Sequence, residues 1–202
     1  MPDAAESKDA KVLSSKTLAT CGPFRLDEHQ VILPTGRQAR VFVAEHPGSV
    51  VIAAIKPPYN IILLRQYRFP AREWLWELPA GTLSPGEEPE ACARRELSEE
   101  AGYEADRWTL LADFFTAPGF TSERMRMFLA RNIHKTAAHP EVDEVITEVR
   151  EVPVEEAVRW IRDGKIRDGK TIAGIYEARD YLAQVQLTDT QKNLEKKSQS
   201  PA

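Results

Sequence analysis

Two continuous apolar runs place the strongest constraint on what this chain can fold into. Val50–Ile55 and Ile61–Tyr67 are separated only by the turn sequence Pro57-Pro58-Tyr59-Asn60. A short apolar run without polar alternation is typical of a strand that is buried on both faces. The sequence therefore predicts a sheet that other layers cover on both sides.

Three later segments have the start and stop residues of helices. Glu87-Glu88-Pro89 begins one that stops at Gly102, Val154–Asp163 is a second, and Thr171–Leu187 is a longer third. Further short strands are predicted at Trp74–Leu78, Leu110–Thr116 and Met125–Ala130. Strands and helices interleave without regular βαβ spacing, which indicates an α/β protein with a mixed sheet flanked by helices.

The chain divides into four predicted parts. Residues 1–12 are polar and predicted to be flexible, and residues 13–48 form a β region with a hairpin over Phe24–Glu45. Residues 49–187 form the main domain. Residues 188–202, which end in QKNLEKKSQSPA, are predicted to be a disordered tail.

Charge and cysteine content exclude several classes of protein. The net charge of −4, from 27 basic and 31 acidic residues, argues against a nucleic-acid-binding surface. The longest apolar run is far too short to cross a membrane, and no signal peptide is apparent. Two distant cysteines, Cys21 and Cys92, fit a reducing compartment, so we expect a cytoplasmic protein.

The helix after Pro89 concentrates carboxylates on one face. At about 100° per residue, Glu96, Glu99 and Glu100 fall within an arc of roughly 100°. An acidic face is more often plain solvated surface, but Glu96 and Glu100 repel at i,i+4 by roughly 0.2–0.5 kcal/mol. No lysine lies one turn away to offset this repulsion. Converging carboxylates are what a hard divalent cation such as Mg²⁺ prefers, so a metal site is the better interpretation.

The same stretch resembles the Nudix box, in which a glycine, a glutamate and the motif R-E-U-x-E-E-x-G-U recur at fixed spacing. The matching positions are Gly81, Glu87, Arg95, Glu96, Leu97, Glu99, Glu100 and Gly102, with Tyr103 at the last apolar position. This resemblance implies an α/β/α sandwich with a mixed sheet, plus here a small N-terminal β-hairpin region. It also implies hydrolysis of a nucleoside diphosphate linked to another group.

The flanks of the box are similar to the ADP-ribose pyrophosphatase branch of this family. They include Gln66-Tyr67-Arg68, the ELPAG sequence that ends at Gly81, and Pro118-Gly119 in a loop that ends at Glu123. The resemblance implies cleavage of ADP-ribose to AMP and ribose 5-phosphate. Taken alone, Pro118-Gly119 is an ordinary turn and Arg68 a surface charge.

Site roles follow from the resemblance, residue by residue. Glu96, Glu99 and Glu100, with the backbone carbonyl of Ala80, are expected to hold Mg²⁺, with Mn²⁺ as the alternative. Arg95 is expected to orient the glutamates by ion pairing, and Glu87 to steady the loop before the helix. Arg68, with the Pro118-Gly119 turn, is expected to contact substrate, since a guanidinium can bind two phosphate oxygens.

The general base is expected to come from an acidic loop rather than from the box. The matching segment is His139-Pro-Glu141-Val-Asp143-Glu144, in which Glu144 is the first choice and Glu141 the second. Glu123 is a further acid expected to face the site. As a general rule, such an acidic loop is more often solubilising surface.

Alternatives to this interpretation remain open. Another nucleoside diphosphate sugar, such as a GDP- or UDP-hexose, would use the same residues, and these residues do not separate adenine from guanine. A non-catalytic nucleotide-binding module would usually lack box carboxylates, and an isomerase would want a cysteine near the site, which neither Cys21 nor Cys92 clearly provides. In the resembling enzymes the N-terminal segment exchanges between two subunits, so a homodimer is expected, with Phe24 a candidate to stack on adenine.

Overall fold

The structure, a computed structural model, describes residues 9–137 and 145–198, and for residues 188–198 it describes the backbone alone. The chain forms two compact units. The N-terminal unit contains the residues up to Gly48 together with Phe114–Met125. The main unit contains Ser49–Asp113 and the chain from Arg126 onward. Each unit is described in turn.

The N-terminal unit is built on a three-stranded antiparallel sheet in the order β1-β2-β3. Its strands are β1 (Lys11–Cys21), β2 (Phe24–Ile32) and β3 (Gln38–Glu45). The expected hairpin is formed by β2 and β3, whose register runs from Arg25 opposite Glu45 to Ile32 opposite Gln38. The expectation of a flexible segment through residue 12 was wrong at its end, because Lys11 and Val12 already pair with β2.

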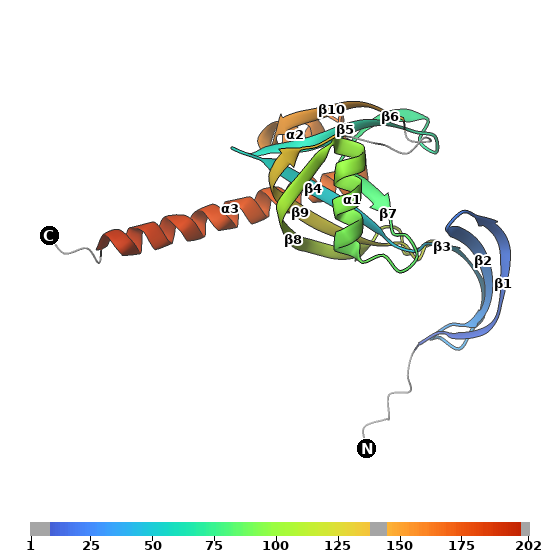
Figure 1. Ribbon diagram of the computed structural model, residues 1–202. Helices are drawn as coiled ribbons and strands as arrows, with labels where there is room; N and C mark the ends of the chain where they lie inside the picture. The colour runs from blue at the N-terminus through green and yellow to red at the C-terminus, as the bar shows by residue number, and fades with distance from the viewer. Residues whose placement is uncertain (1–8, 138–144, 199–202) are drawn as a thin grey trace, which may run out of the picture. The chain divides into compact units, whose positions relative to one another are not determined.

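The main unit contains most of a seven-stranded sheet with the order β10-β5-β4-β9-β8, in which β6 pairs with β5 and β7 with β4. Figure 1 shows this arrangement. The bounds of its strands are β4 (Ser49–Lys56), β5 (Asn60–Arg68), β6 (Glu73–Glu77), β7 (Ala80–Thr82), β8 (Tyr103–Phe115), β9 (Arg124–Lys135) and β10 (Ile146–Pro153).

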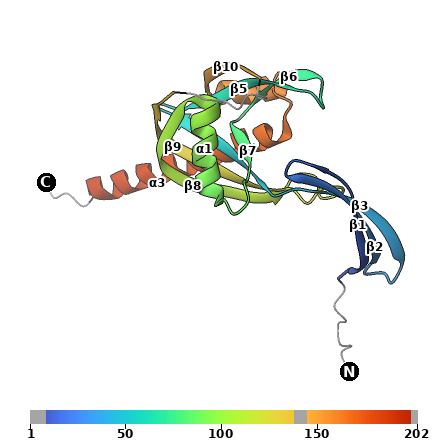
Figure 2. The same ribbon diagram turned by 45° about the vertical axis from the view of Figure 1, so that its right-hand side comes forward.

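Helices cover both faces of this sheet. Helix α1 (Pro89–Ala101) contacts β4, β5 and β7 on one face. Helices α2 (Val154–Arg162) and α3 (Gly169–Ser198) contact each other, and α3 also contacts β4 from the opposite face. The two views in Figures 1 and 2 show α1 in front of the sheet and α3 behind it. The expected α/β/α sandwich with a mixed sheet is confirmed.

The central strands explain why both layers form. Val50, Ile52 and Ala54 of β4 are fully buried in a cluster with Ala93 and Leu97 of α1. The alternate residues of β4 point to the other face, and they are buried as well. Because both faces of β4 are removed from water, its continuous apolar run Val50–Ile55 lies at the centre of the sandwich.

Several elements differ from the sequence prediction. Strand β10 was not predicted, because nearly all of its residues are exposed or half-buried and no apolar run marks it. Helix α3 extends through Ser198, whereas a disordered tail was predicted from residue 188. The backbone there continues as a helix because Gln, Lys, Leu and Glu are good helix formers. Among the described residues, no helix has the length and apolar character needed to cross a membrane.

Candidate active site: carboxylates on one face of a helix

Helix α1 packs against β7, the short strand that precedes it in the sequence. Its proline stands at the first helical position, and it ends at Gly102, whose N–H bonds to the carbonyls of Leu97 and Ser98. On its inner side, the carboxylate of Glu96 lies directly over Gly81. A Cβ atom at Gly81 would come within 1.9 Å of Glu96 Cδ and Oε1. With the Glu96 carboxylate in this position, only glycine fits, and any larger residue would displace that carboxylate.

Glu100 joins the same region from the next turn of α1. Its side chain is 2% exposed, and its Oε2 accepts a hydrogen bond of 2.9 Å from the backbone N–H of Ala80. Glu96 is 7% exposed. Two carboxylates of one helix face are thus buried beside the short β7 segment that begins with Ala80 and Gly81.

Arg95 lies at the edge of the group of glutamates and pairs with several of them. Its Nε and Nη2 donate to the two oxygens of Glu87 at 3.0 and 3.1 Å. Its Nη1 donates to Glu99 Oε2 at 2.9 Å and lies 2.7 Å from Glu96 Oε1. The guanidinium hydrogen bonds lower the pKa of Glu87 from 4.5 to about 2. Arg95 therefore contacts three glutamates through hydrogen bonds and ion pairs.

The donor set of this cluster fits a divalent cation. Glu87, Glu96, Glu99 and Glu100 bring four carboxylates, and Arg95 offers one guanidinium among them. Buried carboxylates in excess of cations are unfavourable unless a positive charge compensates them. Hard oxygen ligands gathered in this way are the ligands that Mg²⁺ or Mn²⁺ takes.

A different group of possible ligands lies in the N-terminal unit. Atoms of Asp27, His29 and Glu45 lie within 4.8 Å of one another. His29 Nδ1 is hydrogen-bonded to Ser15 Oγ at 2.8 Å, and Glu45 Oε2 accepts from Ser122 Oγ at 2.7 Å. This group belongs to the N-terminal unit, whereas the box glutamates belong to the main unit.

Arg68 occupies a position that the sequence did not anticipate. Its Nε and Nη2 donate to both oxygens of Glu77, with Nη2 2.8 Å from Oε2. Glu77 is 1% exposed and also contacts Lys170 Nζ at 2.5 Å. Glu77 and Lys170 were not among the predicted site residues. Glu77 stands in the ELPAG sequence that resembles the family, and that resemblance was the available signal for it.

Three other predicted site residues, Pro118, Gly119 and Glu123, belong to the N-terminal unit. Pro118 and Gly119 form a turn of the N-terminal unit, closed by a hydrogen bond from Phe120 N to Ala117 O. Glu123 of the same unit accepts from Thr116 Oγ1 at 2.6 Å and lies 3.6 Å from His46 Nε2.

The proposed general bases, Glu144 and Glu141, lie outside the described residues. The part of the chain that the structure describes thus joins Ala80, Arg95 and the three box glutamates.

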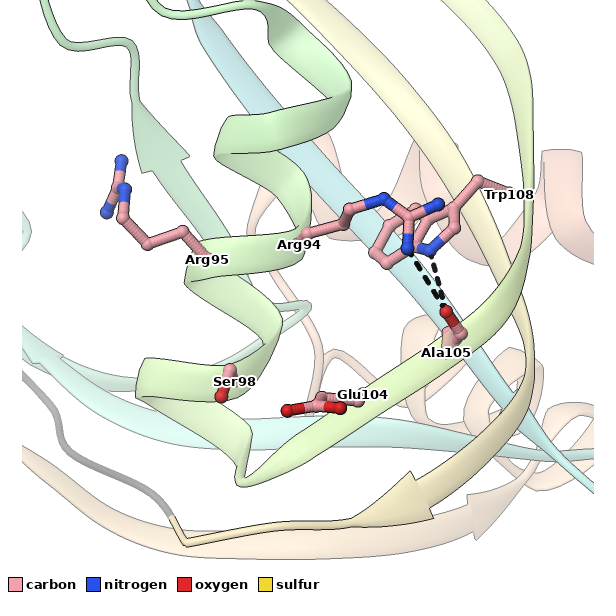
Figure 3. Close-up of a pocket in the computed structure, with 6 residues that line it drawn as sticks. All are labelled: Arg94, Arg95, Ser98, Glu104, Ala105 and Trp108. Atoms are coloured by element: carbon pink, nitrogen blue, oxygen red, sulfur yellow. Dashed lines mark hydrogen bonds between the residues drawn. The ribbon is translucent and has the colours of Figure 1, made fainter.

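A shallow pocket lies on another flank of α1, with a volume of about 370 Å³ (Figure 3). Arg94 lies over the ring of Trp108, with its guanidinium carbon 5.0 Å from the ring centroid. Both side chains donate to the carbonyl of Ala105, at 3.3 and 3.0 Å. Figure 3 shows Arg95 pointing away from these two residues. The box glutamates do not line this pocket.

Comparison with known proteins gives the family. A model of the NUDIX domain matches residues 45–174. ADP-ribose pyrophosphatase of Bacillus subtilis is 34% identical over 171 residues, which cover 84% of this chain and 92% of that protein. ADP-ribose pyrophosphatase of Mycobacterium tuberculosis is 40% identical over 171 residues, which cover 83% and 82%. GDP-mannose pyrophosphatase of Klebsiella pneumoniae is 34% identical over 135 residues, which cover 62% and 67%.

A solved structure supports the same assignment at the level of the fold. The crystal structure of an ADP compounds hydrolase has a TM-score of 0.77 and covers 90% of this chain and 98% of its own. At 20% identity the likeness concerns the fold alone. The family match covers more than half of the chain, and it includes the helix whose carboxylates gather beside Gly81. The chain therefore belongs to the NUDIX domain family and is a Nudix hydrolase.

Proposed function

We propose that this chain hydrolyses the diphosphate bond of ADP-ribose and releases AMP and ribose 5-phosphate. The observation that carries the proposal is the burial of Glu96 and Glu100 beside Gly81, with Arg95 bracing Glu96 and Glu99. Two relatives named ADP-ribose pyrophosphatase match more than four fifths of the chain, which favours this substrate.

In this proposal Glu96, Glu99 and Glu100 hold Mg²⁺ or Mn²⁺, and the carbonyl of Ala80 contributes a further oxygen. When bound, the metal supplies charge neutralisation at the diphosphate and a water of lowered pKa. Arg95 holds Glu96 and Glu99 in place, so the ligands are ordered before substrate arrives.

The remaining tasks fall to residues beyond the box. Arg68 contacts the diphosphate through the part of its guanidinium that Glu77 does not engage, and the Pro118-Gly119 turn shapes the substrate site. Glu144 accepts the proton of the attacking water, with Glu141 and then Glu123 as the next choices.

The test is the turnover of ADP-ribose with Mg²⁺ by Glu96→Gln, Glu144→Gln and a matched control. Glu90→Gln is the control, because Glu90 is exposed on the same helix and pairs with Arg94. We expect Glu96→Gln to lose turnover by orders of magnitude with an unchanged melting temperature, and Glu90→Gln to keep it. Full activity of Glu96→Gln would contradict the metal assignment, and full activity of Glu144→Gln would move the base to Glu141 or Glu123.

A second candidate substrate is another nucleoside diphosphate sugar, which the similarity to a GDP-mannose pyrophosphatase favours. Both substrates have the same diphosphate for the box to act on and differ in the base and the sugar. Product analysis with ADP-ribose, GDP-mannose, UDP-glucose and diadenosine polyphosphates distinguishes them. If kcat/KM is highest for GDP-mannose, the site assignments stand and the substrate changes.

We also propose that the chain acts as a cytoplasmic homodimer. The N-terminal sheet exposes large apolar side chains that a second copy could cover, among them Leu18, Phe24, Leu26 and Phe42. Light scattering on the purified chain gives the mass directly. A monomer at micromolar concentration would contradict the proposal and would leave the assignments of the main unit untouched.

A further inference from the structure

Three side chains that can bind a metal ion meet on one face of the N-terminal sheet. Asp27 and His29 are two residues apart on β2, so they point to the same side of it. Glu45 ends β3 directly opposite Arg25, which precedes Asp27 by two residues, so Glu45 shares that side. One ligand atom from each of the three lies within 4.8 Å of the other two.

Asp27 is a buried acid with one oxygen unsatisfied. Its side chain is 8% exposed, and its Oδ2 accepts a hydrogen bond of 3.2 Å from Arg25 Nη2. Its Oδ1 is buried and has no hydrogen-bond partner among the residues that the structure describes. A buried polar atom without a partner is unfavourable, and a bound ion is one way to satisfy it.

His29 and Glu45 are each held by one atom and have a second atom to offer. The Oγ of Ser15 is hydrogen-bonded to His29 Nδ1 at 2.8 Å, and the Oγ of Ser122 donates to Glu45 Oε2 at 2.7 Å. The remaining atoms, His29 Nε2 and Glu45 Oε1, face each other at 3.7 Å. A histidine that binds metal through one ring nitrogen is typically oriented by a hydrogen bond at the other.

The N-terminal sheet has little apolar core of its own. Among all residues of β1, β2 and β3, only Asp27 and Val31 are buried. Small units with so little buried apolar surface are often stabilised by a structural metal ion. An ion held by Asp27, His29 and Glu45 would join β2 to the end of β3 and add free energy where hydrophobic burial supplies little.

We propose that Asp27, His29 and Glu45 bind one Zn²⁺ ion through Oδ1, Nε2 and Oε1, with water as the fourth ligand. An imidazole nitrogen beside two carboxylates suits Zn²⁺, whereas the oxygen ligands of the box suit Mg²⁺. This site lies in the N-terminal unit and does not depend on the proposed function of the main unit.

The separations of the ligand atoms are compatible with this ion. Ligands about 2.1 Å from a tetrahedral Zn²⁺ lie about 3.4 Å from one another. The 3.7 Å between His29 Nε2 and Glu45 Oε1 therefore has to shorten by about 0.3 Å. The other separations, which are at most 4.8 Å, have to shorten by at most about 1.4 Å, a distance that side-chain rotation covers.

The experiment measures Zn²⁺ binding to the full chain without substrate, by competition with a coloured zinc chelator in excess Mg²⁺. All variants carry Glu96→Gln, which removes a ligand of the box and so weakens Zn²⁺ binding there. We expect this background to bind one Zn²⁺ per chain, and His29→Gln or Glu45→Gln to abolish that binding. Ser15→Ala, which frees the His29 ring, is expected to weaken it about tenfold.

Two matched controls should keep the ion. Glu28→Gln lies between Asp27 and His29 but points to the other side of β2, where Glu28 pairs with Arg40. His134→Gln removes an exposed histidine that pairs with Glu104 in the main unit. Loss of Zn²⁺ binding in His134→Gln, with binding kept in His29→Gln, would show adventitious binding at the surface and overturn the inference.

X-ray absorption at the zinc edge tests the same site without any change in the N-terminal unit, so the test stands even if a variant there does not fold. With the Glu96→Gln chain loaded with one Zn²⁺, we expect a single imidazole in a shell of nitrogen and oxygen ligands. A shell without imidazole, or a background chain that binds no Zn²⁺, would overturn the inference. Neither result bears on ADP-ribose turnover by the wild-type chain, which tests the proposed function separately.

Discussion

Gly81 offers the sharpest test of the carboxylate site, because the geometry fixes how far a neighbour must move. In Gly81→Ala the new Cβ would lie 1.9 Å from Cδ and Oε1 of Glu96, and 2.5 Å from its Cγ. Ordinary contact begins near 3.4 Å, so the carboxylate must shift by about 1.5 Å. A misplacement of about 1 Å at a reacting centre costs on the order of 10²-fold in rate.

We therefore expect Gly81→Ala to lower kcat/KM by at least about 10²-fold, which corresponds to about 2.7 kcal/mol in the activation barrier. The assay is steady-state turnover of ADP-ribose over a range of Mg²⁺ concentrations, with the melting temperature as a check on folding. Gly169→Ala is the control, since nothing lies within 4 Å of its added Cβ. Near-normal turnover and Mg²⁺ dependence in Gly81→Ala would refute the claim that Glu96 must lie where it does.

Three further predictions concern the surroundings of this site. Because the pKa of Glu87 is depressed to about 2, its ion pair stabilises the fold fully above about pH 4.5 and progressively less as the pH falls toward 2; urea denaturation should show the advantage of wild type over Glu87→Gln shrinking below pH 4.5, and a constant difference would contradict it. Arg95→Lys should lower the free energy of unfolding by about 2 kcal/mol, since a single ammonium cannot reach both Glu87 and Glu99; unchanged urea denaturation would show that the network adds nothing. Cys92 is buried with a pKa raised to about 12, whereas Cys21 is exposed, so Ellman's reagent should find one thiol in the native chain and two in denaturant.

The sequence could predict those features that depend only on residues close together in the chain. The spacing of Glu96, Glu99 and Glu100 places them on one helix face in any context, and the apolar run of β4 requires cover on both sides. Gly81 was recognised as part of a motif, but its reason, the carboxylate that lies over it, became visible only in three dimensions.

Contacts between residues far apart in the sequence could not be predicted from the sequence alone. Glu77 and Lys170 lie 93 residues apart, and nothing in either local sequence indicates that they meet. Arg68 was predicted from the resemblance as a phosphate contact, and its pairing with Glu77 depends on the neighbouring strands β5 and β6. Strand β1 falls largely within the β region expected over residues 13–48, but it was not identified as a separate strand, because all of its residues are exposed and show no buried side.

The arginine within the carboxylate cluster gives the site a resident positive charge that no chelator can extract. Arg95 spans Glu87, Glu96 and Glu99, so part of the repulsion among these carboxylates is offset by a charge that belongs to the chain itself. The helix and the loop before it therefore keep a covalently attached counter-ion at every metal concentration.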